Sequence, residues 1–192
     1  MKLATDQRPA LFTSLDLRIA LCVLICFLVP TVLSQLGVTF AVGEAHLEII
    51  QRLTACFACL LCCQEGLDES RHASVTRLII TAVGGLVGML VVGIDMALGS
   101  NPWVLTLLVS LGTIATLVAC KAVGVPYVNA RIGALTFLLV ASMLAGTARL
   151  WYALFRFLST LFGAVVVVLV TWLLGPKGTA DAGRVPRHAK EG

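Results

Sequence analysis

Two segments of the sequence repeat a spacing of arginine, threonine and glycine that suits the handling of an anion. Residues 77–84 and 156–163 both read Arg-x-x-x-Thr-x-x-Gly. The offset between them, 156 − 77 = 79, also superposes Arg52 on Arg131 without a gap. Arginine keeps its charge and binds carboxylates through two parallel hydrogen bonds. We interpret the chain as an internal duplication that carries its arginines in matching pairs.

Arg52 and Arg131 are predicted to lie inside membrane spans, near opposite faces of the membrane. An arginine in a span costs several kcal/mol unless it reaches the headgroups, pairs with an acid or faces water. One interpretation is a conduit that attracts anions at each mouth, and the other is an arginine that extends to the lipid headgroups. We favour the conduit, because the sequence offers no acidic residue inside the spans to neutralise both.

The second arginine pair, Arg77 and Arg156, begins two apolar segments. Two interpretations stay open for these side chains: direct support of the anion path, or anchoring of a helix end at the membrane interface. The threonines and glycines at i+4 and i+7 share a helix face with the arginine, and small residues there let helices approach closely. The positions predicted to pack helices are Thr81, Gly84, Gly88, Thr160 and Gly163.

Other reactive side chains give weaker signals. The run Cys56-x-x-Cys59-x-x-Cys62-Cys63 resembles a metal motif, but no histidine accompanies it, so we expect helix packing and no metal site. Acidic and histidine residues at 44, 46, 48 and 95 either take part in proton coupling or belong to solvated loops. Hydrolase triads, phosphate loops and dinucleotide fingerprints are missing from the sequence, so we expect neither an enzyme nor a cofactor.

The composition predicts an integral membrane protein. Of the 192 residues, 59% are hydrophobic and 12% are charged, with a mean hydropathy of +0.99. A soluble domain is usually about half apolar and a quarter charged. The formal charge of +4 is therefore not a sign of a nucleic-acid partner. Its meaning depends on where the Lys and Arg residues lie relative to the lipid bilayer.

The hydropathy pattern predicts six transmembrane helices. Residues 1–17 are expected to form a cytoplasmic tail, 18–174 the membrane domain, and 175–192 a basic cytoplasmic tail. Residues 37–46 are expected to form a loop, residues 64–74 a polar loop, and Pro30 a kink or early end in the first span. The expected helices cover 19–36, 47–63, 75–96, 103–120, 127–144 and 151–174.

Loop charges predict the orientation. Most Lys and Arg residues fall on one side if both termini are cytoplasmic, which follows the tendency of cytoplasmic loops to be basic. The two repeats, about 18–96 and 97–174, would then be inverted relative to each other. Inverted repeats are frequent in secondary transporters, where the solute path lies at the repeat interface.

The stretch from Gln64 to Ser70, the motif at residues 77–84 and its echo at Arg156 resemble the fusaric acid resistance protein-like and aromatic acid exporter superfamily, to which the plant aluminium-activated malate transporters are similar. The resemblance implies export of organic anions, such as aromatic or small carboxylates, across a bacterial inner membrane. It also implies that basic residues of the second and fifth helices line the path. Many members carry a second half or a cytoplasmic domain, so we expect this half-size chain to form a homodimer or higher homo-oligomer.

Two functions follow as hypotheses. The first is a transporter or channel-like permease that exports organic anions, with Arg52, Arg131, Arg77 and Arg156 along the path. The alternative is a non-transporting membrane subunit that assembles with a larger partner through its small-residue faces.

Overall fold

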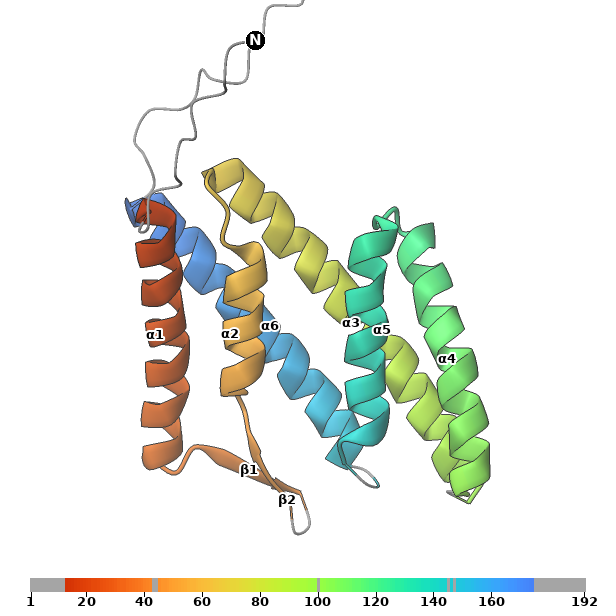
Figure 1. The fold of residues 1–192 in the computed structure, drawn as a ribbon. Helices are drawn as coiled ribbons and strands as arrows, with labels where there is room; N and C mark the ends of the chain where they lie inside the picture. Colours follow the sequence, from red (N-terminus) through yellow and green to blue (C-terminus); the bar gives the residue numbers. More distant parts are fainter. Residues whose placement is uncertain (1–12, 43–44, 100, 145, 147, 175–192) are drawn as a thin grey trace, which may run out of the picture.

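The computed structural model describes residues 13–42, 45–99, 101–144, 146 and 148–174. This part of the chain folds into six α-helices and one two-stranded β-hairpin (Figure 1). The expected tails at 1–12 and 175–192 lie outside the described residues. The elements are α1 (Ser14–Gln35), β1 (Thr39–Val42), β2 (Ala45–Glu48), α2 (Arg52–Cys62), α3 (Leu67–Ala97), α4 (Pro102–Ala122), α5 (Tyr127–Ser142) and α6 (Ala148–Leu174).

Helix α1 begins earlier than predicted. The Thr13 hydroxyl accepts a hydrogen bond from the Asp16 backbone, and the Asp16 carboxylate accepts one from the Thr13 backbone. This reciprocal cap satisfies donors that the first turn would otherwise leave free, so residues expected in the tail are helical. Pro30 lies inside the helix, which continues to Gln35, so the expected early end is wrong.

The connection after α1 is a β-hairpin and not the predicted loop. Strand β1 pairs antiparallel with β2, with Phe40 opposite Leu47 and Ala41 opposite His46. Residues 47–51, predicted to begin the second helix, belong to β2 and the turn that follows it, and α2 starts only at Arg52. The alternating β-branched and aromatic residues of Val38–Val42 explain the strand.

Helix α3 also begins earlier than predicted and takes in most of the expected polar loop. Asp68 and Glu69 occupy its first turn, where acidic side chains complement the helix dipole. The Ser70 hydroxyl accepts a hydrogen bond from the Gln64 backbone N–H and donates one to the Gln64 carbonyl. The polar residues of this segment therefore stabilise a helix start. The other helix bounds agree with prediction to within about three residues.

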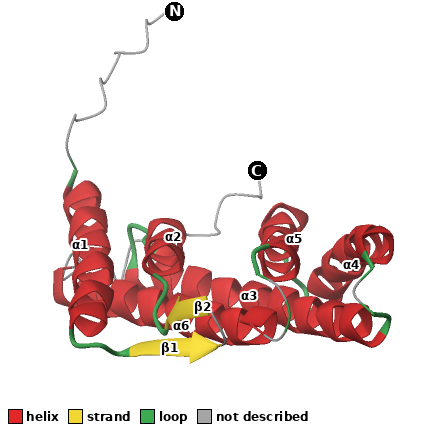
Figure 2. Cartoon of the chain, turned by 90° about the horizontal axis from the view of Figure 1, so that it is seen from below, coloured by secondary structure: helices red, strands yellow, loops and turns green. Residues whose placement is uncertain are grey.

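The helices form two layers (Figure 2). Helices α3 and α6 run side by side in one layer, and the other four stand over them in the order α1, α2, α5, α4 (Figures 1 and 2). Of the two helices in the other layer, α1 and α2 contact mainly α6, while α4 and α5 contact mainly α3. The third helix of each half therefore packs against the first two helices of the other half.

Two glycines allow the closest helix contacts between the layers. A Cβ atom at Gly84 would lie 2.5 Å from the Gly133 carbonyl oxygen of α5. A Cβ atom at Gly163 would lie 2.6 Å from the Ala55 carbonyl oxygen of α2. These glycines are 79 residues apart, and the carbonyls they face are 133 − 55 = 78 residues apart, so the α3–α5 and α6–α2 contacts correspond.

Four helices are long and apolar enough to cross a membrane: α1, α3, α4 and α6. The other two are shorter, α2 with 11 residues and α5 with 16. A membrane span needs about 20 helical residues, so α2 is much shorter than the predicted second span. The fold is that of a helical membrane protein, with one hairpin added to the all-α class that the sequence predicted.

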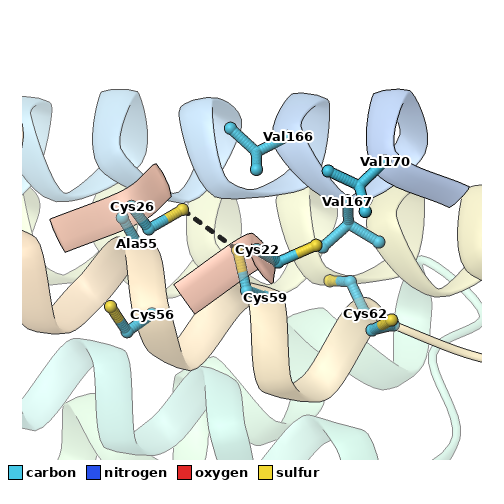
Figure 3. Close-up of a cluster of buried hydrophobic side chains, with 10 residues drawn as sticks. Cys22, Cys26, Ala55, Cys56, Cys59, Cys62, Val166, Val167 and Val170 are labelled. Atoms are coloured by element: carbon cyan, nitrogen blue, oxygen red, sulfur yellow. Dashed lines mark hydrogen bonds between the residues drawn. The ribbon is translucent and has the colours of Figure 1, made fainter. Parts of the chain in front are cut away.

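The contact between α1 and α2 is rich in cysteine. Cys22 and Cys26 face Cys59, and the Sγ atoms of Cys26 and Cys59 are 3.1 Å apart (Figure 3). All seven cysteines are buried and free. Six of them, all except Cys120, form a core cluster with Val167 of α6, as expected for small polarizable side chains between helices.

Candidate functional site

The described residues enclose an open pocket of about 570 Å³ at the end of the bundle where α3 begins. Three helices that are distant in sequence form it: the end of α2, the first half of α3 and the start of α5. We call it the α3 pocket. Its wall is mixed, with apolar side chains beside charged and amide groups. The lining residues are Leu61, Gln64, Glu69, His72, Ala73, Thr76, Arg77, Ile80, Pro126, Asn129 and Ile132.

Arg77 is the buried cation of the α3 pocket. Its residue is only 7% exposed, and its Nε and Nη1 atoms have no hydrogen-bond partner among the described residues. Cys62 of α2 is a neighbour, and Arg156 is near enough for the two positive charges to repel each other. A buried guanidinium without an acid or full hydrogen bonding is costly. The side chain is therefore ready to accept an anionic partner.

Arg156 occupies the matching position in the second half but has different surroundings. Its Nη1 atom donates to the Thr54 hydroxyl at 3.1 Å and to the Tyr152 hydroxyl at 3.4 Å. The residue is 6% exposed, and its Nε atom has no partner among the described residues. Protein hydroxyls therefore accept hydrogen bonds from the Arg156 guanidinium, whereas the buried Nε and Nη1 donors of Arg77 have no acceptor among the described residues.

A polar network extends from Arg156 along the junction of α6 and α2. Thr54 donates its hydroxyl hydrogen bond to Gln51 Oε1 at 3.0 Å. The backbone N–H of Gln51 donates to the Ser159 hydroxyl at 2.7 Å. These bonds fix the Thr54 hydroxyl so that it accepts from the guanidinium, which explains its orientation.

Aromatic side chains join the hairpin to the start of α6. The Phe40 ring of β1 lies 4.7 Å from the Trp151 ring and 5.5 Å from the Phe155 ring, measured between centroids. Offset and edge-on aromatic pairs at these distances attract each other. The hairpin is therefore held against the first turns of α6, next to Arg156.

Arg52 and Arg131, the pair that the sequence favoured, do not line the α3 pocket. Arg52 forms an ion pair with Glu48 of β2, a residue of the predicted second span, so this member of the pair does have an acidic partner. The guanidinium of Arg131 lies 4.9 Å from the centre of the Tyr127 ring in a cation–π contact. The two arginines lie at opposite ends of the bundle, Arg52 at the start of α2 and Arg131 near the start of α5.

The predicted packing positions lie on the α3 and α6 faces that contact other helices. Gly84 and Gly163 make the close approaches described above, and a Cβ atom at Gly88 would lie 2.8 Å from Val140 of α5. Thr81 and Thr160 are buried, and the Thr160 hydroxyl donates to the Arg156 carbonyl. All five side chains are thus inside the bundle.

Sequence reasoning missed most of the pocket wall. The sequence predicts a loop at Glu69 and His72, and no role is predicted for Asn129. A signal was present: residues 69, 72, 73, 76 and 80 fall at intervals of one, three and four, which place them on one helix face. The contribution of Asn129 depends on the packing of α5 against α3, which the local sequence does not reveal.

A second ion pair lies near the C-terminal end of α3. Arg149 Nη1 lies 3.1 Å from Asp95 Oδ2, and the Arg149 Nε donates to the Leu144 carbonyl. The Asp95 side chain is 2% exposed. This pair ties the end of α3 to the start of α6. In the part of the chain that the structure describes, no group of three or more His, Cys, Asp or Glu side chains is arranged to hold a metal ion.

These features define a multi-pass membrane protein with a polar, arginine-containing pocket between its helices. Residues 38–170 match the family described as fusaric acid resistance protein-like. The match covers well over half of the chain, so the protein belongs to this family of membrane transporters, as the motif at residues 77–84 suggested. No curated protein and no solved structure matches the chain.

Proposed function

We propose that the protein is a transporter or channel-like permease for organic anions, with aromatic or small carboxylates as the substrate class. The observation that carries the proposal is Arg77, a buried guanidinium with unused donors in an open pocket. A carboxylate would supply the missing acceptor through charge-assisted hydrogen bonds. Family membership supports transport, and the pocket supports the chemical class.

The α3 pocket suits a carboxylate with an apolar body. Leu61, Ile80 and Ile132 offer apolar surface, while Asn129 and Gln64 offer amide groups. Binding sites for small molecules commonly combine apolar walls with a few polar groups that fix orientation. An aromatic or short aliphatic chain would contact the apolar wall while its carboxylate binds Arg77.

We further propose that residues 18–96 and 97–174 form inverted repeats and that the path lies between them. The layer order α1, α2, α5, α4, the exchange of α3 and α6, and the matching glycine contacts support this symmetry. The two short helices, α2 and α5, occupy corresponding positions in the halves. Short segments at corresponding positions of two repeats indicate the binding site in transporters. In this arrangement all six helices belong to the membrane domain.

The orientation of the proposal follows the basic residues. Arg71, Lys121 and Arg131 lie at the end of the bundle that contains the α3 pocket, which supports a cytoplasmic location for this end. Export from a bacterial inner membrane would then begin at Arg77 and pass Arg156. Arg131 and Arg52 would attract anions near the two mouths. A second copy of the chain would complete a homodimer or higher homo-oligomer.

Equilibrium binding tests the pocket directly. Purified protein in detergent should bind benzoate, and the Arg77→Gln variant should lose binding, because the charged donor is gone. Arg71→Gln is the matched control, since Arg71 lies on the same helix but is exposed and outside the pocket. Equal benzoate binding by wild type and Arg77→Gln would refute the site. If wild type binds no member of a carboxylate panel and copurifies with a larger protein, the assembly-subunit hypothesis replaces this one.

A further inference from the structure

One acidic side chain lines the α3 pocket together with the buried arginine. Glu69 is in the first turn of α3 and shares the pocket wall with Arg77. Glu69 forms no ion pair within the part of the chain that the structure describes. A carboxylate at this place repels a simple anion that enters the pocket. The presence of Glu69 therefore needs a reason beyond the binding of a simple anion.

The start of α3 does not by itself require an acid at position 69. Asp68 is in the same first turn and also complements the helix dipole, but it does not line the pocket. The Glu69 carboxylate lies beside the N-cap residue, where its Oε2 atom would be 3.7 Å from a Cβ atom added at Gly66. Both acids thus suit the helix start, and only Glu69 adds a negative charge to the pocket wall.

Glu69 and Arg77 lie at two ends of the pocket. The sequence separation is 77 − 69 = 8 residues of α3. This separation corresponds to about 12 Å along the helix axis, at about 1.5 Å per residue. Glu69 is exposed, whereas Arg77 is buried, and His72, Ala73 and Thr76 line the wall between them. The pocket therefore carries a negative charge at its exposed end and a positive charge at its buried end.

We propose that the α3 pocket selects carboxylic acids that carry an amine at the end opposite the carboxylate. The inference rests on the proposed function and deepens it, because it names the carboxylates that fit. The carboxylate binds Arg77 and the ammonium group binds Glu69, each through charge-assisted hydrogen bonds. The apolar body between the two charges contacts Leu61 and Ile132 of the pocket wall.

The separation of the two charged residues determines the length of the ligand. A benzene ring with substituents at opposite positions, extended by a hydrogen bond of about 2.8 Å at each end, spans roughly the distance from Glu69 to Arg77. An α-amino acid carries both charged groups on one carbon atom, so it reaches only one of the two residues. The pocket should therefore bind 4-(aminomethyl)benzoate more tightly than the 2-(aminomethyl) isomer, whose charges are side by side.

Three ligands of similar shape test the role of Glu69. They are 4-(aminomethyl)benzoate, 4-methylbenzoate and terephthalate, which present a positive, a neutral and a negative group at the far end. Isothermal titration calorimetry in detergent gives the affinity ratio of 4-(aminomethyl)benzoate to terephthalate. This ratio should fall about tenfold in Glu69→Gln, because an exposed carboxylate changes each affinity by about two- to fivefold. The affinity for 4-methylbenzoate should be similar in the two proteins.

Two further variants make the test specific to the charge at position 69. Asp68→Asn is the matched control, since it removes a carboxylate of the same turn outside the pocket, and the ratio should change by less than about twofold. Glu69→Lys should reverse the preference, so that terephthalate binds more tightly than 4-(aminomethyl)benzoate.

An affinity ratio that is equal in wild type and Glu69→Gln, or that falls equally in Asp68→Asn, would overturn the inference. Equal affinity for the two aminomethyl isomers would overturn the assigned distance between the charges. Loss of 4-methylbenzoate binding in Arg77→Gln tests the proposed function separately. Failure of this inference and failure of the proposed function are therefore distinguishable.

Discussion

Alanine substitution of the two matching glycines should destabilise the protein by similar amounts. An added Cβ atom at Gly84 would lie 2.5 Å from the Gly133 carbonyl oxygen and 3.1 Å from Thr136 Cβ. At Gly163 it would lie 2.6 Å from the Ala55 carbonyl oxygen and 2.9 Å from Ala58 Cβ. An ordinary non-bonded contact is about 3.5 Å. Since backbone atoms block both sites, each helix pair must separate by up to about 1 Å.

The magnitude follows from overpacking and from helix propensity. Overpacking a well-packed contact costs about 1–3 kcal/mol. Gly85 gives the control, because an added Cβ there meets nothing within 4 Å. Alanine at Gly85 should stabilise the helix by about 0.5–1 kcal/mol. This gain applies to all three alanine variants and cancels in the comparison, so Gly84→Ala and Gly163→Ala should be about 1–3 kcal/mol less stable than Gly85→Ala.

Reversible unfolding in mixed detergent micelles, followed by circular dichroism, measures these differences. The free energy of unfolding should fall by similar amounts in Gly84→Ala and Gly163→Ala, and it should rise in Gly85→Ala. If Gly84→Ala were destabilised and Gly163→Ala were as stable as Gly85→Ala, the α3–α5 and α6–α2 contacts would not be equivalent. That result would refute the argument for repeat symmetry from packing.

The two ion pairs should contribute different amounts to the free energy of unfolding, determined by the same measurement. Asp95→Asn should cost about 3 kcal/mol, because it leaves Arg149 partly buried without its acid. Adding Arg149→Gln should recover much of this loss, and no recovery would show that the charge is not the cause. Arg52→Gln should cost less than about 1 kcal/mol, since its side chain is 41% exposed and its pair with Glu48 is screened by water. A larger loss for Arg52→Gln than for Asp95→Asn would contradict the burial assigned to the two pairs.

The long apolar helices were the part of the fold that the sequence predicted well. No charged residue precedes Lys121 in α4, and none follows Arg156 in α6. The ends of α4 fell close to the expected positions because Asn101 and the glycine-containing turn after the helix mark them. The family was also predicted correctly, through the resemblance carried by the 77–84 motif and its echo at Arg156.

The hairpin was missed because hydropathy does not separate a short apolar strand from a helix end. Leu47, Ile49 and Ile50 extend the apolar run of α2 backwards, so the run resembled one span. The strand depends on pairing of β2 with β1 and on contacts of Phe40 with α6. The contacts of Phe40 with α6 join residues over 100 positions apart, and local patterns do not encode them.

The candidate site could be predicted only in part. The repeat drew attention to four arginines, but it gave no means of ranking them. Depth in a span favoured Arg52 and Arg131, whereas packing buried Arg77 and Arg156 and left Arg131 exposed. The ranking depends on which helices surround each guanidinium, and that follows from the exchange of α3 and α6 between the halves.

Benzoate flux into liposomes that contain only this protein tests whether Arg77 binds the transported anion. The comparison is benzoate flux for wild type, Arg77→Gln and Arg71→Gln, with folding of each variant checked by circular dichroism. We expect flux to be lost in Arg77→Gln and retained in Arg71→Gln, because only Arg77 is buried in the pocket. Equal flux in all three proteins would show that Arg77 is not part of the anion path.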